Sequence, residues 1–398
     1  MTLLRAPLGR LLLIGPMALV IFFGVFVFGV SAVTQVSSPN VSVDWQPNNA
    51  TALSLLAENG IQLKHDAAGL KVATEFARRS LMRDPTQARA MAVMGIAADI
   101  RGDHDKARLL VNSAASLSRR QVGTSVWLIE DAAGRGDVRA ALAQYDIALR
   151  TSTEASELLF PILRDGLAEK EIRDALIEVF RWRPNWEHAF VGQAIAEGSK
   201  VEQLVPVFMA LPSDPLMQAS DMRQALLDRL VGQGHYALAD RYYASLRIQP
   251  GGVPRNQTFG ETNGLAPFDW RYGDSGVAMA VRQNGRNMLR FSTDSVIAGP
   301  IASQMVLLKP GRYRLAGKGR YMTPPGAGGV TWQVRCATGD AGTLADAPLR
   351  TSRGGAAFLA FFSVPQGCDA QWIELLIRNP DDVPIDGGIE WIRVDATE

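Results

Sequence analysis

The chain has 398 residues, of which 47% are hydrophobic and 20% charged; this composition argues against extended disorder and leaves room for two ordinary domains. Its 41 basic and 40 acidic residues give a formal net charge of +1. Because surfaces that bind DNA or RNA are clustered and basic, this even balance argues against nucleic-acid binding.

The first predicted element is an apolar helix. No charged residue lies in Leu11–Val33, and about twenty helical residues cross a bilayer. Because Arg5 and Arg10 precede this segment, the positive-inside rule predicts a cytoplasmic stub and transmembrane anchor over residues 1–34. The chain would then be a single-pass protein of the bacterial inner membrane, with the lipid bilayer as a partner and its later domains in the periplasm. The alternative is a signal peptide cleaved near Val30–Ala32.

Residues 35–50, rich in Ser, Pro and Asn, are predicted to be a linker, and residues 51–250 a helical repeat domain. Small residues recur in this domain at the step of about 34 residues that marks one class of helical repeat. The recurring positions are Ala73, Ala107 and Ala141, with Gly102 and Gly136 in the intervening turns. Small side chains would let paired helices approach closely, and each glycine would end the first helix of a pair.

This pattern resembles the tetratricopeptide repeat (TPR), in which an alanine follows the inter-helix glycine and a proline closes the unit. Pro85 closes the first unit, and Tyr145 supplies the aromatic residue of the third. Met91 and Ser125 replace an expected large aromatic residue, and the register drifts beyond Arg150. The resemblance implies about five degenerate units with a surface for a protein partner. A scaffold that only spaces the domains apart is the alternative.

Residues 251–263 are predicted to be a second linker and residues 264–398 a β-rich domain, because the period of the apolar residues changes from helical to alternating. The candidate strands are Val277–Arg282, Met288–Ser292, Gln304–Leu308, Gly311–Gly317, Gly329–Ala337, Ala356–Val364, Gln371–Arg378 and Gly388–Val394. Short strands separated by turns favour an antiparallel β-sandwich or jelly roll. The expected fold class is therefore multidomain α + β, with a transmembrane helix, a TPR-like α-helical solenoid and a C-terminal β-sandwich.

Three segments of this domain resemble strands of carbohydrate-binding modules of the galactose-binding jelly-roll type. They are LKPGRYRLAGKGR from Leu308, FFSVPQGCDAQWIELLIRN from Phe361 and GGIEWIRVDA from Gly387. Such domains follow TPR-like repeats in proteins encoded near bacterial exopolysaccharide genes. The resemblance implies a periplasmic adaptor in the assembly or export of cell-surface polysaccharide. Its helical repeats would hold a protein partner, and its sandwich would contact polysaccharide.

Alternation assigns side chains to the two faces of the candidate strands. Trp332 and Cys336 are expected in the core, as are Ile373, Leu375 and Ile377. The opposite face would carry the candidate binding residues, which are Gln333, Arg335, Trp372, Glu374 and Arg378. An indole ring can stack on a sugar while amide and charged groups bind hydroxyls. The alternative is that a loop, the helical domain or the strand of Trp391 covers this face.

Cys336 and Cys368 are the only cysteines, and export would favour a disulfide bond between them; two unpaired buried thiols are the alternative. Neither the cysteines nor the histidines have metal-site spacing. No nucleophile elbow, phosphate-binding loop or dinucleotide motif occurs. We therefore expect no metal, no cofactor and no enzyme activity. A structural envelope protein that binds no glycan and a glycan-processing enzyme are the alternative functions.

Overall fold

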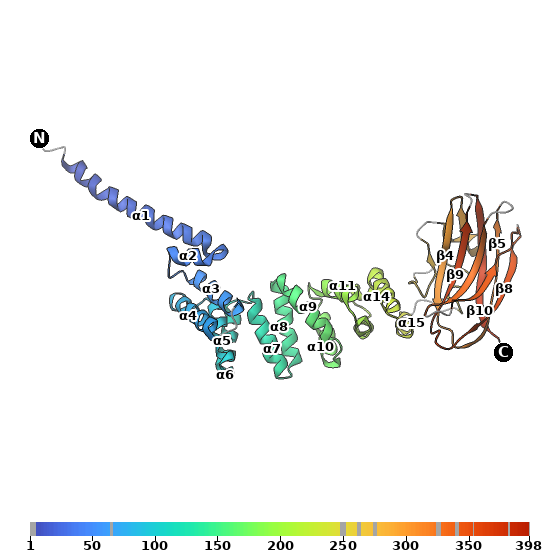
Figure 1. The fold of residues 1–398 in the computed structure, drawn as a ribbon, viewed down its shortest axis with the longest axis horizontal. Helices are drawn as coiled ribbons and strands as arrows, with labels where there is room; N and C mark the ends of the chain where they lie inside the picture. The colour runs from blue at the N-terminus through green and yellow to red at the C-terminus, as the bar shows by residue number, and fades with distance from the viewer. Residues whose placement is uncertain are drawn as a thin grey trace. The chain divides into compact units, whose positions relative to one another are not determined.

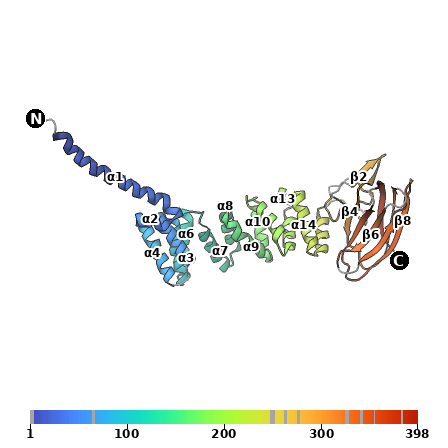
Figure 2. The same cartoon turned by 45° about the horizontal axis from the view of Figure 1, so that its top comes forward.

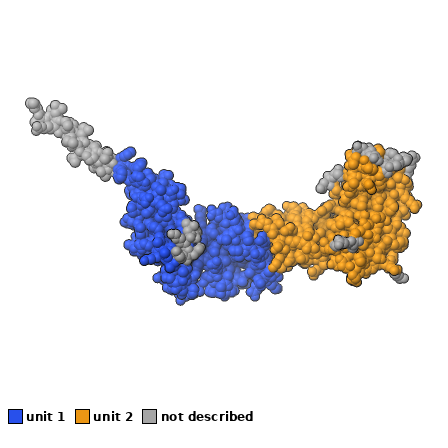
Figure 3. Space-filling view, in the orientation of Figure 1, with its two compact units in different colours: residues 1–186 blue, residues 187–398 orange. Residues whose placement is uncertain are grey.

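The structure is a computed structural model that describes residues 5–63, 67–246, 252–260, 264–273, 277–323, 328–338, 342–352, 354–380 and 383–397, without the side chains of residues 5–20 and 62–63. The chain divides into two compact units, residues 1–186 and 187–398 (Figure 3). The first unit is helical, and the second consists of helices followed by a two-sheet antiparallel β-sandwich (Figures 1 and 2). The expected combination of helical and β-sandwich parts is confirmed.

Packed helix pairs build most of the first unit. Its helices are α1 (Arg5–Ser37), α2 (Pro39–Trp45), α3 (Ala50–Leu63), α4 (Ala67–Arg83), α5 (Ala88–Ile100), α6 (His104–Leu117), α7 (Val122–Gly134), α8 (Val138–Thr151), α9 (Glu154–Gly166) and α10 (Lys170–Phe180). The recurring alanines, Ala73, Ala107 and Ala141, are buried on α4, α6 and α8, the second helices of three pairs. Small side chains at these positions allow the helices of a pair to lie close together.

The turns within two of these pairs repeat the same backbone conformation. Gly102 and Gly136 both have positive φ angles, +84° and +72°, which glycine adopts without a steric penalty. The following Asp103 and Asp137 each cap the next helix by accepting a hydrogen bond from a backbone N–H of its first turn. This region is consistent with a repeat solenoid, but these features do not by themselves identify the TPR family.

The predicted inner-membrane anchor is wrong. Across the stretches that the structure describes, no helix has both the length and the apolar character required to cross a bilayer. The C-terminal end of α1 instead makes polar contacts: Ser31 is buried, its hydroxyl lies 2.8 Å from that of Ser42, and it accepts a hydrogen bond from Asn49. These contacts join α1 to α2, a helix that lies within residues 35–50, where the sequence predicted a linker. The predicted topology, periplasmic location and bilayer partner depended on the anchor and are withdrawn with it.

The second unit begins with α11 (Glu187–Glu197), a short 3₁₀ helix η1 (Val201–Leu204), α12 (Val205–Ala210), α13 (Pro215–Gln218), α14 (Ser220–Gly232) and α15 (Tyr236–Ser245). The single helical domain expected over residues 51–250 is therefore shared between the two units. Gly234, before α15, has a φ of +80° and repeats the turn seen at Gly102.

Two five-stranded antiparallel sheets face each other in the sandwich. Sheet 1 has the order β1 (Arg271–Tyr272), β4 (Ile297–Val306), β9 (Gln371–Asn379), β6 (Gly329–Cys336) and β7 (Thr343–Pro348). Sheet 2 has the order β2 (Ala278–Gln283), β3 (Arg286–Thr293), β10 (Ile385–Ala396), β5 (Gly311–Met322) and β8 (Ala356–Val364). Every candidate strand overlaps an observed one. The sequence did not predict β1, which has two residues, or β7, whose TLADAP sequence alternates weakly.

The sandwich core contains the residues that alternation predicted. Trp332, Ile373 and Leu375 are each 0% exposed. A disulfide bond joins Cys336, at the end of β6, to Cys368, just before β9, with 5.7 Å between their Cα atoms, so the expected pairing is confirmed.

Residues 252–260, expected to be part of a linker, are integrated into the sandwich. Phe259 is 1% exposed and belongs to the core. The buried amide of Gln304 bonds the backbone of Arg255 in both directions, accepting from its N–H at 2.6 Å and donating to its carbonyl at 3.0 Å. The N–H of Val394 donates to the carbonyl oxygen of Val253. Glycine, proline and asparagine mark turns here, not a linker.

Candidate functional site

Four of the five candidate binding residues lie together on the outer face of sheet 1. Strands β6 and β9 are neighbours, and their register places Gln333 opposite Glu374 and Arg335 opposite Trp372. Arg378 is exposed further along β9, opposite Gly329. The predicted parity of both strands is therefore confirmed, whereas ligand binding by these residues stays a prediction.

The polar groups of this face are already paired with one another. The Nε and Nη2 atoms of Arg335 donate to the two carboxylate oxygens of Glu374, at 2.7 and 2.9 Å. The same guanidinium lies over the Trp372 ring, 5.7 Å from its centre, and Gln333 donates to Asp346. A ligand would have to compete with a two-bond ion pair and reach a ring that is partly covered. The face therefore offers few available groups to a sugar.

A second candidate site, absent from the sequence-based prediction, lies on the outer side of sheet 2. We call it the Trp391 hollow. It has a volume of about 810 Å³. Strand β10 contributes Gly388, Glu390 and Trp391, strand β5 contributes Arg320, and the β2–β3 hairpin contributes Gln283, Asn284, Arg286, Asn287 and Met288, with Thr258 completing the lining.

Local sequence shapes the sides of this hollow. Asn284 and Gly285 have φ angles of +51° and +78°, which fits the two-residue hairpin turns that favour Asn-Gly. A β-bulge between Ile389 and Trp391 adds Glu390 to β10, and both Glu390 and Trp391 line the hollow. Gly388 leaves space for the Met288 side chain beside it, because a Cβ atom there would lie 2.6 Å from Cε of Met288.

The Trp391 hollow combines an indole ring with available amides. Trp391 is half-buried and lines the hollow although Arg393 lies 5.4 Å from the centre of its ring. The exposed side chains of Gln283, Asn284 and Asn287 make no hydrogen bond to any described residue. An aromatic surface with several free amide donors and acceptors is chemistry suited to sugar hydroxyls.

The sequence contained part of this signal. Trp391 shares its parity with Arg393, and the Asn-Gly turn predicts a hairpin that would carry amides at its tip. No local sequence pattern shows that β10 pairs with β3, because the two strands are about a hundred residues apart in the sequence. Their adjacency follows from the order of strands in the sheet.

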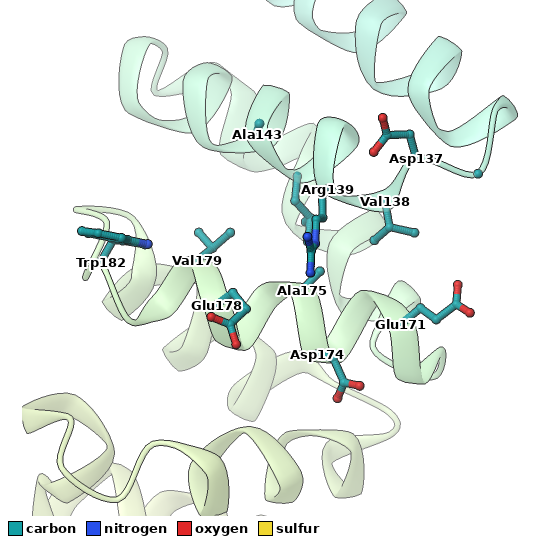
Figure 4. A pocket seen from close by; sticks show the side chains of 12 residues that line it. Asp137, Val138, Arg139, Ala143, Glu171, Asp174, Ala175, Glu178, Val179 and Trp182 are labelled. Atoms are coloured by element: carbon teal, nitrogen blue, oxygen red, sulfur yellow. The ribbon is translucent and has the colours of Figure 1, made fainter.

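A further hollow of about 830 Å³ lies in the first unit between α8 and α10. Figure 4 shows Arg139 reaching from α8 towards Ala175 of α10, with carboxylates along α10 and Trp182 at one end. The Trp182 side chain is 83% exposed, while Asp174 and Glu178 form ion pairs with neighbouring basic residues of their own segment. This hollow is an open groove with a prominent aromatic residue.

Within the described ranges, no group of three or more His, Cys, Asp and Glu side chains is arranged to hold a metal ion.

No protein-family model matches the chain, and no curated protein matches it. Solved structures similar to it include TmCBM61 in complex with β-1,4-galactotriose, at 15% identity and a TM-score of 0.26, covering 32% of this chain and 88% of that one. Another is the CBM22-1 xylan-binding domain from Paenibacillus barcinonensis Xyn10C, at 12% identity and a TM-score of 0.27, covering 36% and 92%. A third is a family 16 carbohydrate-binding module, at 18% identity and a TM-score of 0.24, covering 31% and 89%. At these TM-scores, the similarity assigns neither a ligand nor an activity to this chain.

Proposed function

We propose that the C-terminal sandwich binds a glycan in the Trp391 hollow. One observation carries this proposal: a half-buried indole and three amide side chains without described partners line the same hollow of about 810 Å³. A sugar ring has an apolar C–H face that stacks on an aromatic ring, and its hydroxyls bind amide groups. The face around Trp372 has the same residue types, but they bind one another.

The proposed role is binding without catalysis. Hydrolysis of a glycosidic bond generally uses two carboxyl groups, about 5–10 Å apart, on either side of the bond. Among the described residues lining the Trp391 hollow, Glu390 is the only carboxylate. Lys318 lies 3.0 Å from it and binds it in an ion pair.

Substitution of Trp391 tests the proposal directly. In affinity electrophoresis of the whole chain through gels containing individual polysaccharides, we expect Trp391→Ala to weaken retardation tenfold or more, since burial of a large side chain contributes roughly 1.5–3 kcal/mol. Gln283→Ala, at an exposed position of the same hollow, should weaken it less, without disturbing the core. Trp372→Ala is the matched control and should retain binding.

Other outcomes would contradict this assignment. If Trp372→Ala abolished binding while Trp391→Ala retained it, the outer face of sheet 1 would be the site. If the wild-type chain bound no polysaccharide, the proposal would be wrong, and a structural role without glycan binding would replace it.

The second part of the proposal gives the helical region a protein partner, making the chain an adaptor in the assembly or export of cell-surface polysaccharide. Its support is Trp182, whose exposed ring borders the α8–α10 groove (Figure 4); aromatic residues are enriched among those that dominate binding energy in protein interfaces. Cross-linking in cells should give adducts that Trp182→Ala removes. Met82→Ala, at an exposed apolar position on α4, should leave them. Equal adducts from both variants would exclude this groove as the partner surface.

A further inference from the structure

Positive side chains outnumber negative ones around the Trp391 hollow. Arg286 and Arg320 line it, and Glu390 is the only carboxylate among its described lining residues. Glu390 is also within 3.0 Å of Lys318, which offsets its negative charge. Arg286 therefore adds a positive charge to the hollow that no ion pair with a described residue offsets.

Arg286 differs from other arginines on the same outer face of sheet 2. Arg290 lies 3.3 Å from Asp386, and Arg314 lies 2.9 Å from Asp395. Arg286 is exposed and makes no ion pair with a described residue. Its guanidinium is therefore available to an anionic ligand, whereas the other two groups already have a carboxylate partner.

The two arginines of the hollow approach β10 from opposite sides. Arg286 begins β3, which pairs with one edge of β10, and Arg320 lies on β5, opposite Gly388 on the other edge. Trp391 belongs to the strand between them. A sugar ring stacked on this indole would lie in the same hollow as the available guanidinium of Arg286, and guanidinium groups bind carboxylates through paired hydrogen bonds.

We infer that the ligand of the Trp391 hollow is an acidic polysaccharide whose uronic-acid residues supply carboxylates. This inference rests on the proposed glycan binding and adds the class of the ligand. The indole recognises the apolar face of the sugar, the amides bind hydroxyls, and Arg286 binds the carboxylate. Charge attraction alone would not require Trp391, so dependence on both residues is the distinguishing property.

The test compares polymers that differ in charge alone. Whole-chain protein is run in affinity electrophoresis against polygalacturonate, alginate and hyaluronan, each beside its carboxyl-reduced neutral form. We expect at least one acidic polymer to be bound about tenfold more tightly than its reduced form, as expected for hydrogen bonds to charged groups. Arg286→Gln should remove most of that difference, because an uncharged amide cannot replace the paired, charged hydrogen bonds of a guanidinium. Arg290→Gln is charge-matched and lies outside the hollow lining, so it should preserve the difference.

The other outcomes separate this inference from the proposed function. Equal binding of acidic and reduced polymers, still dependent on Trp391, would overturn the acidic ligand and leave glycan binding intact. Binding of acidic polymers and dextran sulfate alike, unaffected by Trp391→Ala, would show non-specific charge attraction and overturn the inference. Absence of binding to every polymer would overturn both.

Discussion

A carboxylate buried in a sheet requires a partner, because removing its charge from water is unfavourable. Glu374 is 6% exposed and has both oxygens bonded by Arg335, whose guanidinium also lies over Trp372. The residues belong to two strands that are paired in the centre of sheet 1. This cluster therefore joins β6 to β9 by side chains as well as by backbone hydrogen bonds.

Removal of the Arg335 guanidinium should show how far the pairing of β6 with β9 depends on its ion pair with Glu374. We expect Arg335→Ala to lower the free energy of local opening by about 2 kcal/mol, less than for a fully buried pair because Arg335 is partly exposed. Arg314→Ala, which breaks a more exposed pair with Asp395, should change it by about 0–1 kcal/mol. Hydrogen exchange in the whole chain measures the first effect at β9 amides and the second at β10 amides. A smaller effect for Arg335→Ala than for Arg314→Ala would contradict this interpretation.

Alkaline pH should destabilise the second unit through Tyr242. Burial raises the pKa of its phenol from 10.0 to about 12. Below pH 10 the folded and unfolded states both retain this proton; between pH 10 and 12 the unfolded state loses it first, so stability falls as pH rises. Tyr242→Phe should reduce the loss of stability between pH 9 and pH 11 in urea unfolding, whereas Tyr236→Phe on the same helix should not. Identical pH profiles for both variants and the wild type would exclude Tyr242 as the cause.

Period-two alternation was sufficient to place Trp332 in the core and Trp372 on the opposite face. It could not show which strand would lie beside which, and that is why the Trp391 hollow was missed. Its arginines and amides belong to β2, β3, β5 and the β2–β3 turn, and only the order of strands in the sheet brings them next to β10. Nor could alternation show that Arg335 would bind Glu374 and cover Trp372.

Close approach of paired helices depends on small residues at their contacts. A Cβ atom on Gly95 of α5 would lie 2.6 Å from Cγ2 of Val111 and 3.3 Å from the carbonyl oxygen of Ala107, both on α6. Among the described residues, none would lie within 4 Å of a Cβ atom on Gly192 of α11. The same residue type thus has a packing function in one helix and none of this kind in another.

These two glycines give a matched test of helix packing. Gly95→Ala should destabilise the protein by about 1–3 kcal/mol, because an overfilled contact forces the helices apart. Gly192→Ala should stabilise it by roughly 0.4–1 kcal/mol, because it restricts the unfolded chain. Thermal unfolding followed by circular dichroism at 222 nm measures whether each variant is destabilised or stabilised. Stabilisation by Gly95→Ala would show that α5 and α6 have room for a methyl group.

Composition and periodicity predicted correctly whether most elements are helices or strands. They did not predict which of the connecting segments pack against the rest of the protein. Residues 35–50 contain α2 and residues 252–260 contribute to the sandwich, although both looked like linkers. Ser, Pro, Asn and Gly favour turns wherever they occur, so their presence does not distinguish a free connection from a packed one. The packing of Phe259 and the hydrogen bonds of Gln304 depend on residues that are distant in the sequence.

At the scale of the whole molecule, α11–α15 and the sandwich form one compact unit. Within it, Arg255 binds Asp240 of α15 at 2.7 Å and lies over Tyr243, while Arg271 of β1 binds Asp228 of α14. Side chains of β1 and of the segment before it therefore connect the helices of this unit to its sheets.

Fragment stability should reflect this arrangement. The free energy of unfolding of a fragment of residues 252–398 should exceed that of a fragment of residues 264–398 by about 3 kcal/mol or more. The difference would come from the burial of Phe259 and from the two hydrogen bonds of Gln304. Urea unfolding followed by tryptophan fluorescence measures the difference. Equal midpoints would show that residues 252–260 add nothing to the sandwich. A fragment of residues 187–398 should be at least as stable as the longer of the two.

The strand order has a consequence for synthesis on the ribosome. Strands β9 and β10 occupy the middle of sheet 1 and sheet 2, yet they follow every other described strand in sequence. Until they emerge, each sheet exists as two separate halves: β1–β4 and β6–β7 in one, and β2–β3 and β5–β8 in the other. Such halves expose unpaired strand edges, which favour aggregation. A nascent chain would thus need protection until its final strands appear, and a premature stop codon before β9 would divide both sheets.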